Sequence, residues 1–213
     1  MLSDYPDVGI GYSTNENYTP SLIQTIHNKV SILAVFGDSK NIDLTEDRQA
    51  INNLKNTEPV FLHQPISREL IQQLRSRRGW DVFFFAGHSQ REINVGRIYL
   101  NERESLTLDQ FKNALTEAIS NGLKIAIFNS CDGLGLAQRL ADLHIPVVIA
   151  MQEIVPDLVA QSFLKEFLTE YNCGLPLYTA VRRAQARLEE FTDYPGATWL
   201  PLIFQNPNVI PPQ

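Results

Sequence analysis

The sequence predicts an α/β fold built on a mostly parallel sheet, and two observations carry that prediction. First, short apolar runs rich in β-branched and aromatic residues alternate with segments whose apolar residues recur at helical spacing. Strand, helix, strand, helix, strand is the order that crossover connections produce in a parallel sheet. Second, two apolar runs, WDVFFFAGHS at 80–89 and LKIAIFNSCDGLGLAQRL at 123–140, break abruptly into small and polar residues that include His88 and Cys131.

The N-terminal half provides the first units of this alternation. Residues 1–28 are polar, with glycine and proline among them, and are expected to form a lead-in, as a linker or an edge hairpin. Thr45 stands ahead of an acidic first turn, which predicts an N-capped helix. The expected elements before the His88 run are strands at 30–37 and 59–65 and helices at 43–56 and 66–77.

The C-terminal half continues the alternation of strands and helices after one segment with a different pattern. Residues 96–108 alternate apolar and polar side chains around a turn, which predicts a small antiparallel hairpin beside the sheet. The segment from Thr107 to Gln110 then opens a helix that Gly122 closes. Beyond the Cys131 run we expect helices at 133–143, 155–172 and 177–191, strands at 145–151 and 198–204, and a short exit tail at 208–213.

Length and charge narrow the class of protein. A chain of 213 residues forms one domain by default. The net charge is −6 and no basic stripe is present, which argues against nucleic-acid binding. Because no apolar segment reaches the ~20 residues that span a bilayer, and no signal-peptide pattern opens the chain, a cytoplasmic protein without membrane contact is expected. Its two cysteines are then expected to be free thiols.

The two strand-end residues suggest catalysis by a thiol. Carboxyl ends of parallel strands share one sheet edge, so His88 and Cys131 would face each other if their strands are neighbours. A glycine-rich turn at 132–135 allows a helix to start behind the thiol and favour the thiolate. Taken singly, Cys131 would be interpreted as a small buried hydrophobe and His88 as a structural histidine. The other histidines lack ligand spacing, so neither a metal nor a cofactor is expected.

Larger sequence motifs resemble a known family. Histidine comes first, and cysteine follows about 40 residues later in N-S-C-x-G-x-x-x-A, a separation similar to that of caspase-like sequences. Together with the segments at 148–168, 174–188 and 198–207, this resembles a CHAT domain, the caspase-like cysteine-peptidase module related to separase and the metacaspases.

The resemblance implies a fold and a site. The fold would be a caspase-like three-layer sandwich over residues 29–207, with a mostly parallel sheet of about six strands, helices on both faces and a small antiparallel hairpin. Cys131 would be the nucleophile and His88 the general acid and base. The backbone N–H groups of Cys131 and Ser89 would meet the oxyanion, with Ser89 standing where many relatives have glycine.

Substrate preference depends on three candidate pocket residues. Metacaspase-like relatives have an aspartate two residues before the cysteine, where this chain has Asn129. Asp157 resembles an acidic pocket residue of separase and would favour a basic substrate side chain. The competing interpretation is that Asp157 only caps its helix. Glu153 is a weaker candidate for the same wall.

Two functions of different class follow. The first is a cysteine endopeptidase that cleaves a specific protein or peptide partner, compatible with one module of a longer signalling or defence chain. The second is a catalytically silent interaction module on the same fold. An ordinary doubly wound ligand-binding domain, with Cys131 merely buried, is an outside alternative.

Overall fold

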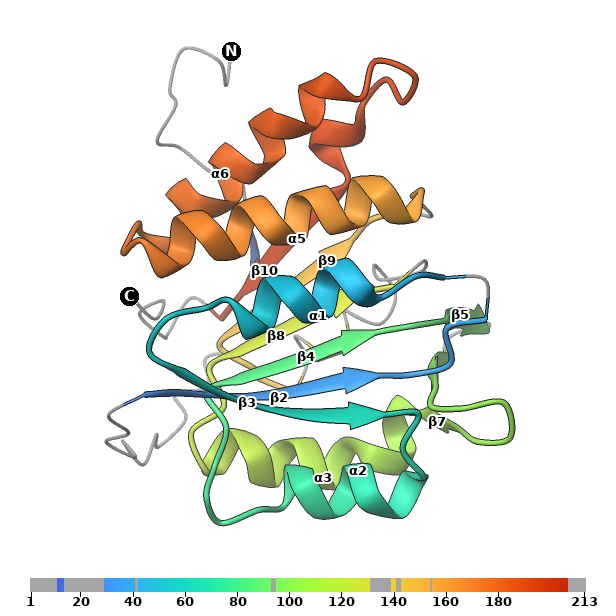
Figure 1. Cartoon of the computed structure of the whole chain (residues 1–213). Coiled ribbons are helices and arrows are strands. Elements are labelled where there is room, and N and C mark those ends of the chain that lie inside the picture. Colours follow the sequence, from blue (N-terminus) through green and yellow to red (C-terminus); the bar gives the residue numbers. More distant parts are fainter. Residues whose placement is uncertain are drawn as a thin grey trace.

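The main sheet is mixed but mostly parallel. The computed structural model describes residues 11–13, 29–40, 42–92, 95–130, 139–140, 143–153 and 155–206. In this described part the main sheet has seven strands in the order β1-β10-β9-β8-β4-β2-β3 (Figure 1). Their bounds are β1 Gly11–Ser13, β2 Val30–Phe36, β3 Thr57–His63, β4 Val82–Ala86, β8 Ile125–Asn129, β9 Val147–Met151 and β10 Pro201–Gln205.

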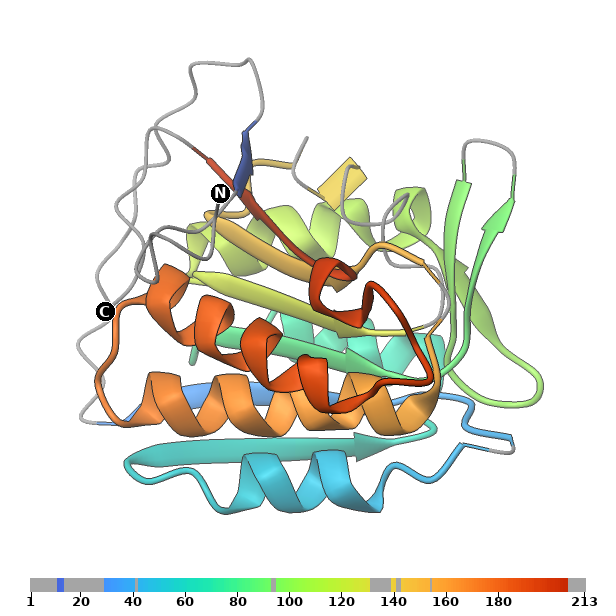
Figure 2. The same ribbon diagram turned by 90° about the horizontal axis from the view of Figure 1, so that it is seen from above.

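Helices cover both faces of the sheet, as expected for three layers. Helices α2 (Ser67–Leu74) and α3 (Leu108–Ser120) lie on one face. Helices α1 (Thr45–Asn52), α5 (Asp157–Asn172) and α6 (Leu177–Arg187) lie on the other, with α5 and α6 side by side (Figure 2). Two short 3-10 turns, Leu188–Glu190 and Ala197–Trp199, complete the second layer.

Burial on both faces explains the continuous apolar runs of the central strands. In β4, Phe83 and Phe85 pack into the core under α2 and α3, whereas Phe84 packs into the core under α1, α5 and α6. All three rings are at most 1% exposed. Since alternate side chains point to opposite faces, a buried central strand needs apolar residues at every position.

A second, smaller sheet lies at the carboxyl end of the main sheet (Figure 1). It has the order β5-β6-β7, with β5 Ser89–Glu92, β6 Val95–Tyr99 and β7 Ser105–Thr107 paired antiparallel. The expected hairpin at 96–108 is confirmed as β6 and β7. Strand β5 was not expected, and it begins directly after His88.

Several element ends differ from the sequence predictions. Helix α1 is shorter than 43–56, and Thr45 is its first residue rather than its cap. Leu44 is the N-cap residue and makes no side-chain cap, while Asp43, one residue earlier, accepts the Thr45 N–H on its Oδ1 at 2.9 Å. The last strand begins at Pro201 instead of residue 198, since Ala197–Trp199 form a 3-10 turn. Strand β10 then runs antiparallel to β9.

The remaining predictions divide between confirmed elements and undescribed segments. Helix α3 begins as expected, with the Thr107 N–H donating to Gln110 Oε1 at 2.7 Å. Within the expected lead-in, β1 pairs parallel to β10 and adds an edge strand to the sheet. The rest of 1–28, the tail at 208–213 and most of the helix expected at 133–143 lie outside the described residues.

A polar cluster joins three strands at the amino edge of the sheet. The Asp81 carboxylate accepts hydrogen bonds from the Ser31 N–H at 2.9 Å and the Ser31 hydroxyl at 3.0 Å, and it pairs with Lys124 Nζ at 2.7 Å. Burial acts to raise the pKa of Asp81, but the donors from Lys124 and Ser31 outweigh it, so the pKa is lowered. The cluster ties β2, β4 and β8 together at the end opposite to His88.

Candidate active site

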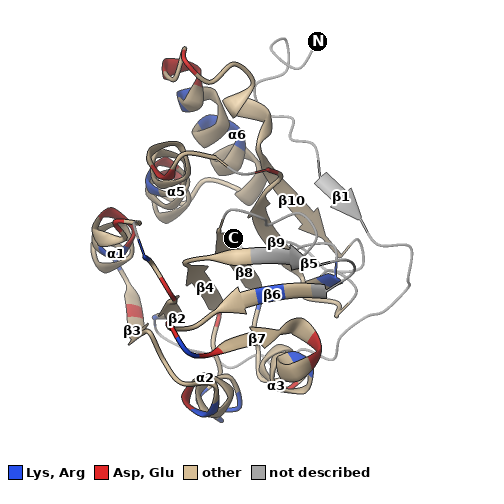
Figure 3. Ribbon diagram, turned by 90° about the vertical axis from the view of Figure 1, so that its right-hand side faces the viewer, with Lys and Arg blue, Asp and Glu red and all other residues tan. Residues whose placement is uncertain are grey.

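The strands that precede His88 and Cys131 are direct neighbours. Strands β4 and β8 pair in parallel, with Ala86 opposite Asn129. In the sequence, His88 and Cys131 each come two residues after this pair, and the pair marks the carboxyl ends of the two strands. Figure 3 looks onto these strand ends. Cys131 itself lies outside the described residues; Ser130, which precedes it, is buried.

The His88 ring has a defined orientation. The ring is half-buried, and its Nε2 lies 2.9 Å from the backbone carbonyl oxygen of Lys40. A carbonyl oxygen can only accept a hydrogen bond, so Nε2 carries the proton in this contact. In the neutral imidazole the other nitrogen, Nδ1, is then the proton acceptor. The site therefore contains a base whose tautomer is set by a main-chain group.

The loop that provides this carbonyl is itself fastened to the histidine. The His88 N–H donates to the Asp38 carbonyl at 2.8 Å, and the Asp38 N–H donates to the Tyr99 carbonyl at 2.9 Å. The Lys40 N–H approaches Asp38 Oδ1 at 3.3 Å. The sequence gives no sign of the role of Lys40, because a main-chain contact requires no particular side chain and so leaves no motif.

Gly87 allows the close approach of these segments. Its φ of 146° is one that residues with a Cβ rarely adopt. A Cβ at this position would lie 3.0 Å from the Asp38 carbonyl oxygen. Glycine directly before His88 is therefore required for the loop to reach the histidine backbone.

The backbone orientation at Ser89 is compatible with the expected oxyanion role. The His88 carbonyl accepts the Tyr99 N–H at 3.0 Å, so residue 88 is a hydrogen-bonded position of the ladder with β6. In an antiparallel ladder the next residue points its N–H away from the partner strand. The Ser89 N–H is accordingly directed away from β6.

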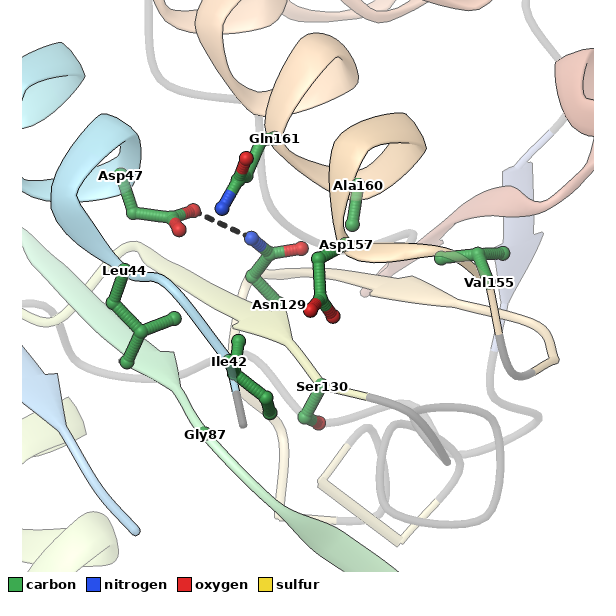
Figure 4. A pocket seen from close by; sticks show the side chains of 10 residues that line it. All are labelled: Ile42, Leu44, Asp47, Gly87, Asn129, Ser130, Val155, Asp157, Ala160 and Gln161. Atoms are coloured by element: carbon green, nitrogen blue, oxygen red, sulfur yellow. Dashed lines mark hydrogen bonds between the residues drawn. The ribbon is translucent and has the colours of Figure 1, made fainter. Parts of the chain in front are cut away.

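A pocket lies beside the two strand ends, between α1 and α5 (Figure 4). The pocket is small, with about 20 Å³ of space for water, and it is open to solvent. Of the three sequence candidates, Asn129 and Asp157 line it, whereas Glu153 is exposed and does not belong to the described lining. The described lining consists of Ile42, Leu44, Asp47, Gly87, Asn129, Ser130, Val155, Asp157, Ala160 and Gln161.

Asp47, a lining residue that sequence analysis missed, is the most buried acid of this pocket. It is 1% exposed, and its Oδ1 accepts a hydrogen bond from Asn129 Nδ2 at 2.6 Å. Burial raises the pKa of Asp47 to about 6, although the amides of Asn129 and Gln161 oppose this shift; the charge of Asp157 adds to it. In the sequence, Asp47 is indistinguishable from a solvated carboxylate in a first helical turn.

Several polar atoms of the pocket are buried without a hydrogen bond. Among the described residues, Asp47 Oδ2, Asn129 Oδ1 and Ser130 Oγ are buried and have no hydrogen-bond partner. The bond from Asn129 Nδ2 to Asp47 assigns the other end of that amide, Oδ1, as the unpaired acceptor. Buried polar atoms are nearly always paired in folded proteins, so this group of atoms requires an explanation.

Asp157 is the first residue of α5 and is half-buried. The structure shows no side-chain cap at the start of α5 within the described residues. The carboxylate still lies in the first turn, where the helix dipole favours a negative charge. Both interpretations of Asp157 therefore remain compatible with its position.

Two further properties concern described residues alone. Groups of three or more histidine, cysteine, aspartate or glutamate side chains that could hold a metal are not found among them. Of the helices in the described segments, none is both long and apolar enough to span a membrane.

Comparisons with known proteins agree with this architecture. The family model of the CHAT domain matches residues 22–197. A solved gingipain structure, "Crystal structure of the Arg specific cysteine proteinase gingipain R (RGPB)", superposes with a TM-score of 0.59 at 12% identity, over 84% of this chain and 46% of that one. The complex of Porphyromonas gingivalis RgpB pro- and mature domains gives 0.55 at 11%, over 84% and 47%.

The chain spans about half the length of the gingipain chains, and at this identity the likeness concerns the fold alone. No curated protein matches the sequence.

Proposed function

Because the chain belongs to the CHAT-domain family, a group with a caspase-like fold, we propose that it is a cysteine endopeptidase with Cys131 as nucleophile and His88 as acid and base. One observation supports this proposal above the others. Ala86 pairs with Asn129 in neighbouring parallel strands, so the two strands that lead to His88 and Cys131 end level with each other. A cysteine with only a packing role would not need to follow a strand that ends level with the histidine strand.

The chemistry follows from the histidine tautomer. Nδ1 of His88 takes the thiol proton of Cys131, and the thiolate attacks the carbonyl carbon of the scissile amide. The N–H groups of Cys131 and Ser89 stabilise the oxyanion that forms. On collapse, the C–N bond breaks and His88 gives its proton to the leaving amine. Water, deprotonated by the same nitrogen, then cleaves the thioester and regenerates the thiol.

The Lys40 carbonyl assists at the step where charge develops. When Nδ1 accepts the thiol proton, the ring becomes an imidazolium, and its Nε2–H donates to this carbonyl at 2.9 Å. Hydrogen bonding to the charged form favours that form. The main-chain oxygen therefore performs the orienting role that a third side chain performs in a triad.

The setting of this activity is part of the proposal. The substrate would be a specific protein or peptide, and the domain would act in the cytoplasm as one module of a longer signalling or defence chain, without a cofactor. A free and exposed Cys173 is consistent with a reducing compartment.

Thiol labelling combined with peptide cleavage tests the proposal. Low-concentration iodoacetamide should label Cys131 well before Cys173, with most of the selectivity lost in His88→Ala, because the thiolate needs the imidazole. On a fluorogenic peptide library, Cys131→Ala and His88→Ala should each abolish turnover, whereas the matched control Cys173→Ser should retain it. Unchanged turnover in either site variant would remove that residue from the mechanism.

The alternative is a catalytically silent interaction module. Its supporting observation is Ser89, whose side chain adds bulk next to the histidine where many relatives have glycine. Equal labelling of Cys131 and Cys173, with no library peptide cleaved, would favour this alternative.

A further inference from the structure

We propose that the amino edge of the sheet carries a second binding site, a pocket for one single-chain carboxylic acid such as a fatty acid. The pocket lies between the sheet and the C-terminal ends of α1 and α5, and it shares no described lining residue with the pocket beside His88. The inference does not rest on the proposed function, because it concerns a different site and is measured by binding alone.

The pocket is large enough to hold a small molecule. Its volume is about 320 Å³, whereas the pocket beside the strand ends has about 20 Å³. Pockets for small ligands begin at about 300 Å³. The volume therefore suits one hydrocarbon chain, rather than the two chains of a membrane lipid.

The short length of α1 leaves room for this pocket. A helix of eight residues is about 12 Å long, whereas the seven residues of β2 extend over about 23 Å. Figure 1 shows α1 above the part of β2 that leads to the carboxyl edge. Because α1 ends at Asn52 and the chain returns to the sheet at Thr57, the helix does not cover the amino end of this sheet face.

The walls of the pocket are mainly apolar. Strands β2, β4 and β8 each contribute two side chains that are two residues apart and so point to the same face of the sheet. These side chains are Val30 and Ile32, Val82 and Phe84, and Ile125 and Ile127. Phe167 and Tyr171 of α5, stacked with their ring centroids 5.6 Å apart, also line the pocket. Such walls favour a hydrocarbon body, because its transfer out of water is favourable.

Two lysines in the lining provide donors for an anionic head group. Lys55 is exposed, and the described residues provide no acidic partner for it. The side chain of Lys124 is 43% exposed and donates one hydrogen bond, to Asp81 Oδ1 at 2.7 Å. An ammonium group has three donors, so two are available to a ligand. A carboxylate accepts charge-assisted hydrogen bonds from such groups.

The one carboxylate in the described lining, that of Asp81, is already compensated. It pairs with Lys124 and accepts from the N–H and the hydroxyl of Ser31. The charged side chains of the described lining are therefore two lysines and one neutralised aspartate, with Lys55 as the uncompensated cation. A negative head group complements this charge.

The helix ends oppose an anion only weakly. Helices α1 and α5 both direct their C-termini toward this end of the sheet, where the helix dipole favours a cation. At the end of α5, however, the N–H groups of Cys173 and Gly174 already pair with the carbonyls of Thr169 and Tyr171, at 3.1 and 3.0 Å. A charge-assisted hydrogen bond from a lysine outweighs a solvent-screened dipole, so a carboxylate remains the preferred head group.

Calorimetric titration with three decyl probes, each below its micelle-forming concentration, tests the chemistry of the ligand. Decanoate should bind one molecule per chain with a Kd below about 100 µM and a negative heat-capacity change, the mark of apolar burial. Decanol should bind at least about fivefold more weakly, and decyltrimethylammonium more weakly still. No binding of decanoate, or equal or tighter binding of either other probe, would overturn the proposal.

Variants of the lining test the location of the site. Val82→Phe places a ring in the pocket and should weaken decanoate binding by at least about tenfold. Val30→Phe should do the same from a position that is 43% exposed, where the fold tolerates the change. Ile66→Phe is the matched control, 52% exposed and outside the described lining, and should bind as the wild type does. Unchanged binding in both filling variants, each shown to be folded by circular dichroism, would overturn the location.

A lysine variant tests the head-group contact separately. Lys55→Gln should weaken decanoate binding about threefold and leave decanol binding unchanged, because only the carboxylate meets the ammonium group. Lys112→Gln, in the exposed part of α3 on the opposite sheet face, is the matched control and should change neither. An equal loss for both probes in Lys55→Gln, or no loss for either, would contradict the role of Lys55.

Discussion

Replacing Asp47 with asparagine should stabilise the fold at neutral pH, because the buried carboxylate opposes folding when it is ionised. Its pKa rises from 3.8 in the ordinary state to about 6 in the folded protein, with burial as the main cause. A difference of about two in pKa corresponds to ~3 kcal/mol between the two protonation states. Asparagine resembles the protonated acid and can still accept from Asn129 Nδ2. We therefore expect Asp47→Asn to gain ~2–3 kcal/mol at pH 8.

The sign of the pH dependence follows from the same values. Between pH 3.8 and about 6 the folded protein binds more protons at Asp47 than the unfolded chain does, so the penalty grows as pH rises through this window. The stability gain of Asp47→Asn should therefore be largest above pH 6. It should decline as pH falls and disappear near pH 3.8.

Urea unfolding followed by circular dichroism at pH 8, 6 and 5 measures this gain. Glu46→Gln is the control, because it removes a negative charge from the first turn of α1 at an exposed position. It should change the free energy of unfolding by no more than about 0.5 kcal/mol. A loss of stability in Asp47→Asn at pH 8, or a gain that does not vary with pH, would refute the assignment of Asp47 as an uncompensated buried charge.

Three other predictions concern the surroundings of the site and the sheet. Lys40→Ala should leave kcat within about twofold, because only its main-chain oxygen contacts the histidine; a large loss would assign a role to the side chain. Gly87→Ala should reduce labelling of Cys131 by iodoacetamide by at least tenfold, since a Cβ would lie 3.0 Å from the Asp38 carbonyl oxygen; unchanged labelling would contradict the need for glycine. Asp81→Ala should cost ~2–4 kcal/mol in urea unfolding at pH 7 by leaving buried donors unpaired. Because the pKa of Asp81 is lowered, this cost should shrink as pH falls below the ordinary value of 3.8, and a cost that rises in acid would contradict the assignment.

The sequence by itself determined the central strands of the main sheet and the order of the helices described between them. Each central strand is recognisable because a strand buried on both faces must be apolar at every position, as in the run of phenylalanines from Phe83 to Phe85. Helix α3 could be predicted with its start because the Thr107 and Gln110 capping pair is local in sequence. His88 was identifiable from a pattern that is also local in sequence, because the abrupt end of an apolar run marks the edge of a sheet.

Tertiary structure alone decided which polar groups surround that edge. Asp47 is buried because the first turn of α1 packs beside α5, which lies more than a hundred residues later in the chain. The sequence around Asp47 does not indicate that contact. The Lys40 carbonyl reaches His88 because the loop after β2 and the end of β4 are neighbours in the sheet. Burial and main-chain hydrogen bonds depend on segments distant in sequence, whereas periodicity and capping depend on residues a few positions apart.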